Sequence, residues 1–267
     1  MKYSTYHAHT EFCDGRSTAR EMILAAIERG CPEIGLSSHY PLTFDSDWSM
    51  KKESVALYIS ELEKLREEYK KQIKVCIGTE VDSMSPPVTE KFDYIIGSVH
   101  HVTVNGQTYS VDASAEETRR AIEAAGSPEE FARYYFEELS GIYDKTRCNI
   151  IGHFDLLLKF NERDPALDTT CEAYIRYRDK ALSHLLSTPA VLEVNTGAIS
   201  RGYRSTPYPE RDVLEIVKRA GKPVIVTSDS HSAATVDYLV DEVARELTDF
   251  GIHCIANLDE LLSITEK

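Results

Sequence analysis

The sequence predicts an α/β protein whose parallel strands curl into an irregular, TIM-like barrel of seven strands. Short β-branched runs alternate with amphipathic segments of helical length, which is typical of right-handed β-α-β units that close into a barrel or form an open sheet. Histidines or carboxylates follow most of these strands, as they would at the C-terminal face of a barrel, where active sites are built. The 267 residues contain no Pro/Gly/Ser-rich linker, so residues 1–267 are expected to form one domain.

Each expected element has a local cause. Thr18 can cap a helix in which Glu21 completes a capping box, and Gly30 follows as the stop. Ser127 before a proline is typical of another helix start. An Asn-Gly pair flanked by alternating residues predicts a hairpin over 102–109, either a lid or substrate wall or an ordinary surface hairpin. The expected strands cover residues 2–6, 33–38, 73–81, 93–101, 149–153, 190–195 and 222–228, and the expected helices 19–29, 51–71, 128–145, 171–186, 209–220 and 233–250.

Composition and charge exclude several classes of partner. The formal net charge is −14, which disfavours nucleic acid as the main partner because polyanion binding depends on clustered Lys and Arg. The N-terminus lacks the pattern of a signal peptide, and no apolar run approaches the roughly 18 residues of a membrane span. We therefore expect a cytoplasmic protein that acts on a small molecule.

The six cysteines form no CxxC pair and fall mostly inside predicted strands or helices. In a chain of this size without a secretion signal they are expected to be reduced structural thiols. Cys13 differs because it lies in the loop after His7 and His9. It is either a metal-bound thiolate or a bystander thiol, and we favour the bystander.

Histidines gather where predicted strands end. His7 and His9 stand at positions i and i+2, so their imidazoles project from the same side of an extended segment. Six unrelated structural histidines are not expected to share such a placement. His184 lies in a predicted helix and His253 lies beside a weak strand, and both are expected to be structural. The histidines at the ends of the other strands are His39, His100, His153 and His231.

Carboxylates share these positions. Glu80 ends the third strand, and its two oxygens can bridge two divalent ions, which a single imidazole cannot. Asp229 and His231 repeat the i, i+2 spacing. Mixed His, Asp and Glu donors without thiolates suit zinc, manganese or iron in hydrolytic sites better than a structural thiolate zinc. The sequence thus predicts a divalent-metal site with more donors than one ion needs.

Together these motifs resemble the polymerase and histidinol phosphatase (PHP) family. They are His7-Ala8-His9-Thr10 with Cys13-Asp14-Gly15, Ser38-His39, Gly78-Thr79-Glu80, Gly97-Ser98-Val99-His100-His101, Gly152-His153 and Ser228-Asp229-Ser230-His231, in the family's order. The resemblance implies a distorted seven-stranded β/α barrel that hydrolyses phosphoester bonds with two or three metal ions. The Glu193-Val194-Asn195-Thr196 segment with Arg201 after it looks most like the histidinol-phosphate phosphatase branch, which implies hydrolysis of L-histidinol phosphate in histidine biosynthesis.

The resemblance also implies a set of nine metal ligands. His7, His9 and Asp229 would bind the first ion, Glu80 would bridge it to a second ion held by His100 and His153, and Asp14, His39 and His231 would hold a third. Some members have a histidine at the position of Asp14. We prefer His100 to His101 because the two point to opposite faces and the family places its ligand first. His101 then meets substrate or supports a neighbour.

Charge agrees with phosphate chemistry. Three divalent ions bring six positive charges, and the expected catalytic carboxylates, Asp14, Glu80 and Asp229, remove three, which leaves a cationic pocket. A metal-bridging hydroxide would attack phosphorus, because metals lower the pKa of bound water. Asp14 or a nearby histidine would protonate the leaving group. Arg201, Arg204 and Lys159 are candidate substrate contacts, with a solvated surface role as the alternative for each. His101 is the fourth candidate.

Two other functions are compatible with the same motifs. One is a related phosphoesterase that acts on nucleotides or nucleic-acid ends, which would need a basic groove. The other is a metal-binding barrel that has lost catalysis, which would show broken ligand motifs. None of the motifs is broken in this sequence.

Overall fold

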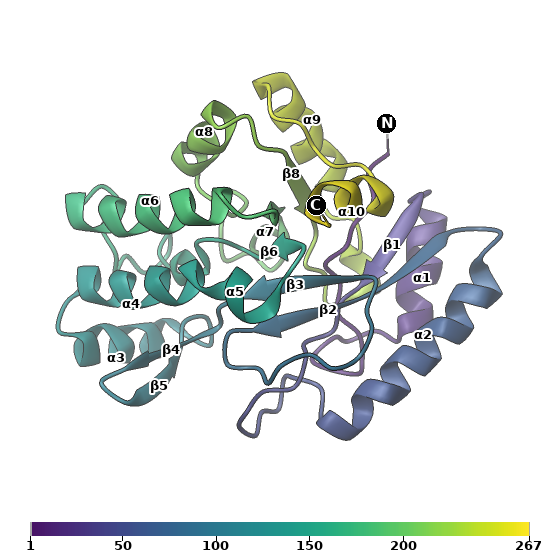
Figure 1. Ribbon diagram of the computed structural model, residues 1–267, viewed down its shortest axis with the longest axis horizontal. Helices are drawn as coiled ribbons and strands as arrows, with labels where there is room; N and C mark the ends of the chain where they lie inside the picture. Colours follow the sequence, from purple (N-terminus) through teal and green to yellow (C-terminus); the bar gives the residue numbers. More distant parts are fainter. Residues whose placement is uncertain (1, 267) are drawn as a thin grey trace.

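The computed structural model describes residues 2–266 and has an α/β fold (Figure 1). Its main sheet is a curled, half-barrel sheet of six parallel strands in the order β1-β2-β3-β6-β7-β8. Because all six run in parallel, their C-terminal ends meet on one side of the sheet. The strands are β1 (Glu33–Leu36), β2 (Lys74–Asp82), β3 (Tyr94–Ser98), β6 (Ile150–Ile151), β7 (Val191–Asn195) and β8 (Val224–Thr227).

The segment expected as a seventh strand, residues 2–6, makes isolated bridges rather than a continuous strand. Thr5 pairs with Ile34 of β1, and Ala8 pairs with Ser230 just beyond β8, both in parallel. The His9 amide also donates to the Ser230 carbonyl at 2.8 Å. The segment therefore lies between the first and last strands of the main sheet, which has six strands among the described residues where seven were expected.

Helices cover the outside of the sheet (Figure 1). The predicted capping box at Thr18 and Glu21 is present at the first of them. Within residues 2–266, no helix is both long and apolar enough to cross a membrane. The helices are α1 (Ala19–Glu28), α2 (Val55–Tyr69), α3 (Ala115–Ala125), α4 (Pro128–Ser140), α5 (Ile142–Thr146), α6 (Glu172–Leu186), α7 (Gly197–Ser200), α8 (Arg211–Arg219), α9 (Val240–Phe250) and α10 (Leu258–Thr265).

Two predicted helices are wrong in their extent. The helix expected over 128–145 is interrupted at Gly141, which caps α4, so α5 is separate. The helix expected over 233–250 starts only at residue 240, because Leu239 takes a left-handed conformation with a φ of 57°. Such a conformation is uncommon for a residue other than glycine and breaks the helical path.

The predicted hairpin is present as β4 (His101–Val104) and β5 (Gln107–Ser110). Asn105 and Gly106 both have positive φ angles, 51° and 83°, as the favoured two-residue hairpin turn requires. The hairpin packs against α3 and α4 and lies outside the main sheet. After β5 the chain returns toward the C-terminal ends of the strands of the main sheet.

Packed apolar side chains fill the end of the sheet opposite to the strand ends. The unpredicted helix α10 lies over this end, and Asn257 caps it by accepting a hydrogen bond from the Glu260 amide. Because this end is filled, the polar residues that follow the strands face the other way. The cluster contains Tyr6, Cys76, Tyr94, Ile96, Ile150, Val191, Ile225, Ile255, Leu258 and Leu261.

Tyr94 shows how tightly the strands pack, and it gives a stability prediction. A Cβ added at Gly78 would lie 2.3 Å from the Tyr94 ring, whereas one added at Gly141 would meet its nearest atom at 3.6 Å. We expect Gly78→Ala to lower the free energy of unfolding by about 1–3 kcal/mol through overpacking. Gly141→Ala, the matched control, is expected to change it by less than about 1 kcal/mol. Urea denaturation at one metal concentration measures both; equal losses would contradict this account of the packing.

Candidate metal centre

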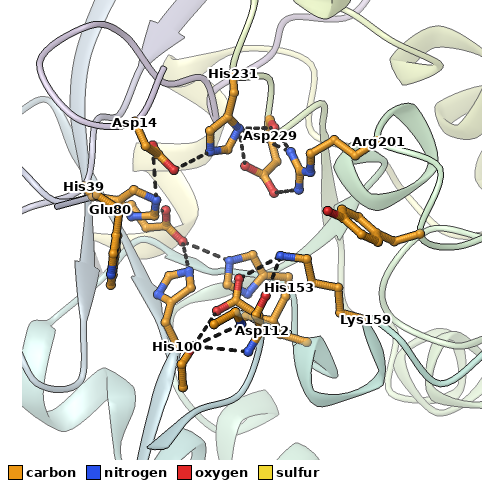
Figure 2. Close-up of a pocket in the computed structure, with 15 residues that line it drawn as sticks. Asp14, His39, Glu80, His100, Asp112, His153, Lys159, Arg201, Asp229 and His231 are labelled. Atoms are coloured by element: carbon orange, nitrogen blue, oxygen red, sulfur yellow. Dashed lines mark hydrogen bonds and ion pairs between the residues drawn. The ribbon is translucent and has the colours of Figure 1, made fainter. Parts of the chain in front are cut away.

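The strand ends bring histidine and carboxylate side chains together on one side of the sheet (Figure 2). Four overlapping groups of donor atoms result, and the atoms of each group lie within 4.8 Å of one another. Their members are the nine residues that the motifs single out as metal ligands. The groups are His9, Asp14, His39 and His231; His7, His153 and Asp229; His7, His9 and Glu80; and His39, Glu80 and His100.

Glu80 is the centre of this cluster, and its two carboxylate oxygens face different imidazoles. Oε2 lies 3.0 Å from His7 Nε2 and 2.9 Å from His39 Nδ1. Oε1 lies 3.0 Å from His153 Nε2 and 3.4 Å from His100 Nε2. The carboxylate is fully buried. This geometry suits a carboxylate that bridges two cations.

Several buried donor atoms of the cluster lack a hydrogen-bond partner among the described residues. They include His7 Nε2, His9 Nε2 and Glu80 Oε2. Leaving such an atom buried without a partner costs about 1–3 kcal/mol. His7 Nε2 and His9 Nε2 lie 3.0 and 3.5 Å from the same Glu80 oxygen, so their lone pairs converge. A divalent cation would satisfy all of them, and nitrogen and oxygen donors of this kind bind zinc, manganese or iron.

The electrostatics of the cluster also favour cations. Burial raises the pKa of Glu80, but His7, His39 and His100 outweigh it and hold that pKa well below its usual range. Burial lowers the pKa of His39, but Glu80 and Asp14 raise it to about 9. The buried carboxylates thus keep their negative charge and require positive charge nearby. Because imidazoles must lose a proton before they bind a metal, metal binding should release protons.

Asp14, His39 and His231 form the more open side of the cluster. Asp14 Oδ2 lies 3.2 Å from His231 Nε2, and Asp14 Oδ1 lies 3.8 Å from His39 Nε2. The Asp14 side chain is 34% exposed, whereas those of His7 and Glu80 are fully buried. A cation on this side would therefore be the one most accessible to solvent and substrate.

Glu193, which was not predicted as a site residue, orients the His7 imidazole and holds the backbone of His153. Its Oε1 lies 2.6 Å from His7 Nδ1, and its Oε2 accepts the His153 backbone amide at 2.6 Å. Thr227 and Asn195 donate to the same carboxylate. Carboxylates that hold the second nitrogen of a ligating histidine fix its tautomer and raise its basicity.

Asp82 supports His100 in the same way and was also missed. Its Oδ2 lies 3.1 Å from His100 Nδ1 and accepts the His100 amide at 2.7 Å. Asp82 is two residues beyond Glu80 on β2, so both side chains project to the same face of the strand. That i, i+2 relation to a predicted ligand is the signal that could have found it.

A cavity of about 280 Å³ opens above the cluster (Figure 2). Two predicted substrate contacts, Lys159 and Arg201, line it. Arg201 donates to the Asp229 carbonyl at 2.7 Å and to the Asp229 carboxylate at 3.0 Å, while Lys159 contacts Asp112. Asp229 itself has a φ of 44°, and such backbone strain is concentrated at functional sites. The aromatic side chains of the wall are Trp48 and Tyr203.

The other two predicted substrate contacts lie outside this cavity lining. Arg204 is buried, donates to the Leu158 carbonyl at 3.2 Å and lies over the Tyr208 ring. The His101 ring stacks on the far side of the cavity wall against Trp48, with ring centroids 5.7 Å apart. Arg204 therefore holds the loop after β7 in place, and the His101 ring packs against Trp48.

Cys13 lies beside the cluster without belonging to it. Its Sγ is 3.5 Å from His9 Nδ1, and it also contacts the Thr10 carbonyl. Burial, with a smaller contribution from Asp14, raises the pKa of the thiol to about 12. A protonated thiol is a poor metal ligand, which agrees with a bystander. All six cysteines are free.

Fold and site together define a divalent-metal protein built on a parallel α/β half-barrel, with a cavity of about 280 Å³ beside the donor cluster. Residues 5–197 match the PHP domain, and the chain belongs to the PHP family. A Deinococcus radiodurans protein named "Probable histidinol-phosphatase" is 28% identical over 92% of this chain and 92% of its own length. The histidinol-phosphatase of Bacillus subtilis is 27% identical over 87% of this chain and 94% of its own length.

A solved structure is similar over almost the whole chain. It is histidinol phosphate phosphatase from Lactococcus lactis, complexed with zinc, L-histidinol and phosphate. The two structures superpose with a TM-score of 0.71 at 24% sequence identity, covering 97% of this chain and 98% of the other. This likeness establishes the fold.

Removing bound metal is expected to destabilise the protein, because the buried carboxylates and imidazoles lose the cations that satisfy them. A cation present at 100 times its dissociation constant stabilises the folded state by about 2.7 kcal/mol. This corresponds to a melting temperature roughly 5–10 °C higher. Calorimetry of protein dialysed against EDTA, with and without added Mn²⁺, measures the difference. Identical melting temperatures would show that the cluster binds no metal under these conditions.

Proposed function

We propose that the protein hydrolyses L-histidinol phosphate to L-histidinol and phosphate, a step of histidine biosynthesis, with residues 1–267 as one catalytic domain. The single observation that carries the proposal is the nine-residue donor cluster under a cavity that also presents Lys159 and Arg201. The substrate follows from the relatives, whose names are those of histidinol-phosphatases. Two or three divalent ions, zinc, manganese or iron, are proposed as cofactors.

We propose that the four donor groups hold these ions, with Glu80 shared between two of them. Such ions supply a nucleophile by acidifying water, and they neutralise the charge of the transition state. The side chains of the protein then have two tasks: to fix the ligating imidazoles and to position the phosphate. Glu193 and Asp82 perform the first of these through their contacts with His7 and His100.

Lys159 and Arg201 position the phosphate. Both side chains are cations on the wall of the same cavity, and the forked donors of arginine match phosphate oxygens. The Arg201 side chain is 30% exposed while it contacts Asp229. It can therefore hold a ligating carboxylate and still reach a phosphate oxygen with its remaining donors.

Asp14 acts in this proposal as a ligand rather than as the general acid. Burial raises its pKa, but His39, His231 and His9 outweigh it and keep that pKa well below its usual range. A nearby metal ion would lower it further. An acid that is already ionised has no proton to give to the leaving alkoxide. This argues against Asp14, the first of the two candidates that the sequence suggests, and leaves a nearby histidine as the second.

A phosphate-release assay on a small panel of esters tests the substrate. The panel holds L-histidinol phosphate, AMP, a sugar phosphate and a phosphodiester, each with Mn²⁺, Zn²⁺, Fe²⁺ and Co²⁺. We expect the highest kcat/KM for L-histidinol phosphate. A higher value for AMP or for the phosphodiester would instead identify a nucleotide or nucleic-acid phosphoesterase, and no release from any ester would identify a metal-binding protein without this activity.

A further inference from the structure

One carboxylate of the cavity wall has no place in the metal cluster. The described residues that line the cavity include four carboxylates, and three of them, Asp14, Glu80 and Asp229, belong to the donor groups. The fourth is Asp112. Figure 2 shows it beside Lys159 on the side of the cavity where His100 and His153 lie.

Asp112 is held firmly in this position. The chain returns from strand β5 of the hairpin, where Ser110 Oγ contacts Asp112 Oδ1 at 3.2 Å and accepts the Asp112 and Ala113 amides. Lys159 Nζ lies 3.0 Å from Asp112 Oδ2 and 2.8 Å from the Asp112 carbonyl. The hairpin that interrupts the β-α alternation thus delivers a fixed carboxylate to the cavity.

The carboxylate can accept a further cation. It has about four lone-pair positions, and its contacts with Ser110 and Lys159 engage one on each oxygen. Its side chain is 24% exposed, more than the 14% of Lys159. Burial raises the pKa of Asp112, but Lys159 and His100 outweigh it and lower that pKa to about 2, so the group is negative at neutral pH.

Lys159 contacts Asp112 and, in the proposed function, also positions the phosphate, so one cation faces two anionic groups. A positive charge on the substrate would supply a second cation. Like charges at close range raise the free energy of the complex. Phosphate esters without a cation are therefore penalised by Asp112. In an ester of a 2-amino alcohol, the ammonium group stands on the second carbon from the ester oxygen, about 4–5 Å from phosphorus by standard bond lengths. With the phosphate at Lys159 and Arg201, that short reach would let the ammonium group contact the wall of the same cavity.

We propose that Asp112 binds the ammonium group of a 2-amino-alcohol phosphate and thereby selects this class of substrate. The inference rests on the proposed function, since histidinol phosphate is such an ester. Lys159 contacts Asp112 and positions the phosphate in the proposed function, so it links the two binding sites. Asp112 is a specificity residue, and it takes no part in breaking the phosphoester bond.

A double-mutant-type cycle tests this proposal: one change is made in the enzyme, at Asp112, and the other in the substrate, at its amino group. The rates kcat/KM of the wild type and of Asp112→Asn are measured on L-histidinol phosphate and on its desamino analogue, 3-(imidazol-4-yl)propyl phosphate. We expect the wild type to prefer the amine and the variant to lower that preference by about 10- to 100-fold, the worth of one hydrogen bond to a charged group. Asp249→Asn, an exposed carboxylate on α9, is the matched control and should leave the preference unchanged.

The outcomes separate specificity from structure. If Asp112→Asn lowers the rates on both esters alike, Asp112 only positions Lys159, and the proposal is overturned. An unchanged preference overturns it as well. The ratio of kcat/KM on O-phosphoethanolamine to kcat/KM on ethyl phosphate, measured for the wild type and for Asp112→Asn, tests Asp112 without histidinol. If Asp112→Asn loses the preference for O-phosphoethanolamine while the wild type does not hydrolyse L-histidinol phosphate, the role of Asp112 is supported and the proposed function is refuted.

Discussion

Replacing Glu80 by alanine is expected to lower kcat/KM for phosphate release by about 10³- to 10⁴-fold, the largest effect of any single substitution in this protein. Glu80 is the residue whose two oxygens face separate sets of imidazoles. Its loss removes a shared donor and one buried negative charge. Since metal ions contribute several kcal/mol of transition-state stabilisation, and each 1.4 kcal/mol or so is tenfold in rate, the rate should fall by several powers of ten.

Two further variants make the Glu80 result specific. Glu80→Gln keeps the shape but offers one oxygen in place of two, so it should lose nearly as much activity as alanine. Glu67→Ala removes an exposed glutamate of α2 and should retain full activity. Metal content is measured by elemental analysis of the same samples. An alanine variant that kept most of its activity would rule out a shared role for Glu80.

Glu193→Gln is expected to weaken metal affinity by about 10- to 100-fold, the usual cost of removing a carboxylate that orients a ligating histidine. In the native protein each carboxylate oxygen has two hydrogen-bond partners. Oε1 contacts His7 and Thr227, and Oε2 contacts His153 and Asn195. In the glutamine variant an NH₂ group replaces one of these accepting oxygens. This NH₂ group then faces groups that also donate hydrogen bonds. His7 then loses its orientation and part of its basicity.

Metal titration followed by activity distinguishes this role from a purely structural one. Activity of Glu193→Gln should recover in part as the metal concentration is raised, because the ligands themselves remain. Glu215→Gln, on the exposed side of α8, is the control. If the folded Glu193 variant bound metal as tightly as the wild type, its carboxylate would have no influence on the centre.

The placement of the donors could be predicted because it depends on local sequence. His7 and His9 lie on one side of an extended segment whatever the rest of the fold does, and residues that end parallel strands share one side of the sheet. The elements with strong local signals, such as the capping box at Thr18 and the Asn105-Gly106 turn, are present for the same reason.

Other features depend on contacts between distant segments, and sequence reasoning missed or misplaced them. Glu193 contacts His7 across 186 positions of the chain, which no spacing rule reveals. Arg204 has the chemistry of a phosphate contact, but packing turns its side chain toward Leu158 and Tyr208 instead. Helix α3 was also not predicted, although its start carries a local signal, a cap at Ser114 with Glu117 three positions on.

The most direct test of the account is a titration of metal into metal-free protein, with bound ions per chain and phosphate release from L-histidinol phosphate measured in the same samples. The donor groups meeting at Glu80 predict that activity is absent without metal and rises steeply only as a second equivalent binds. Full activity in metal-free protein, or activity complete with less than one bound ion per chain, would contradict a shared metal centre.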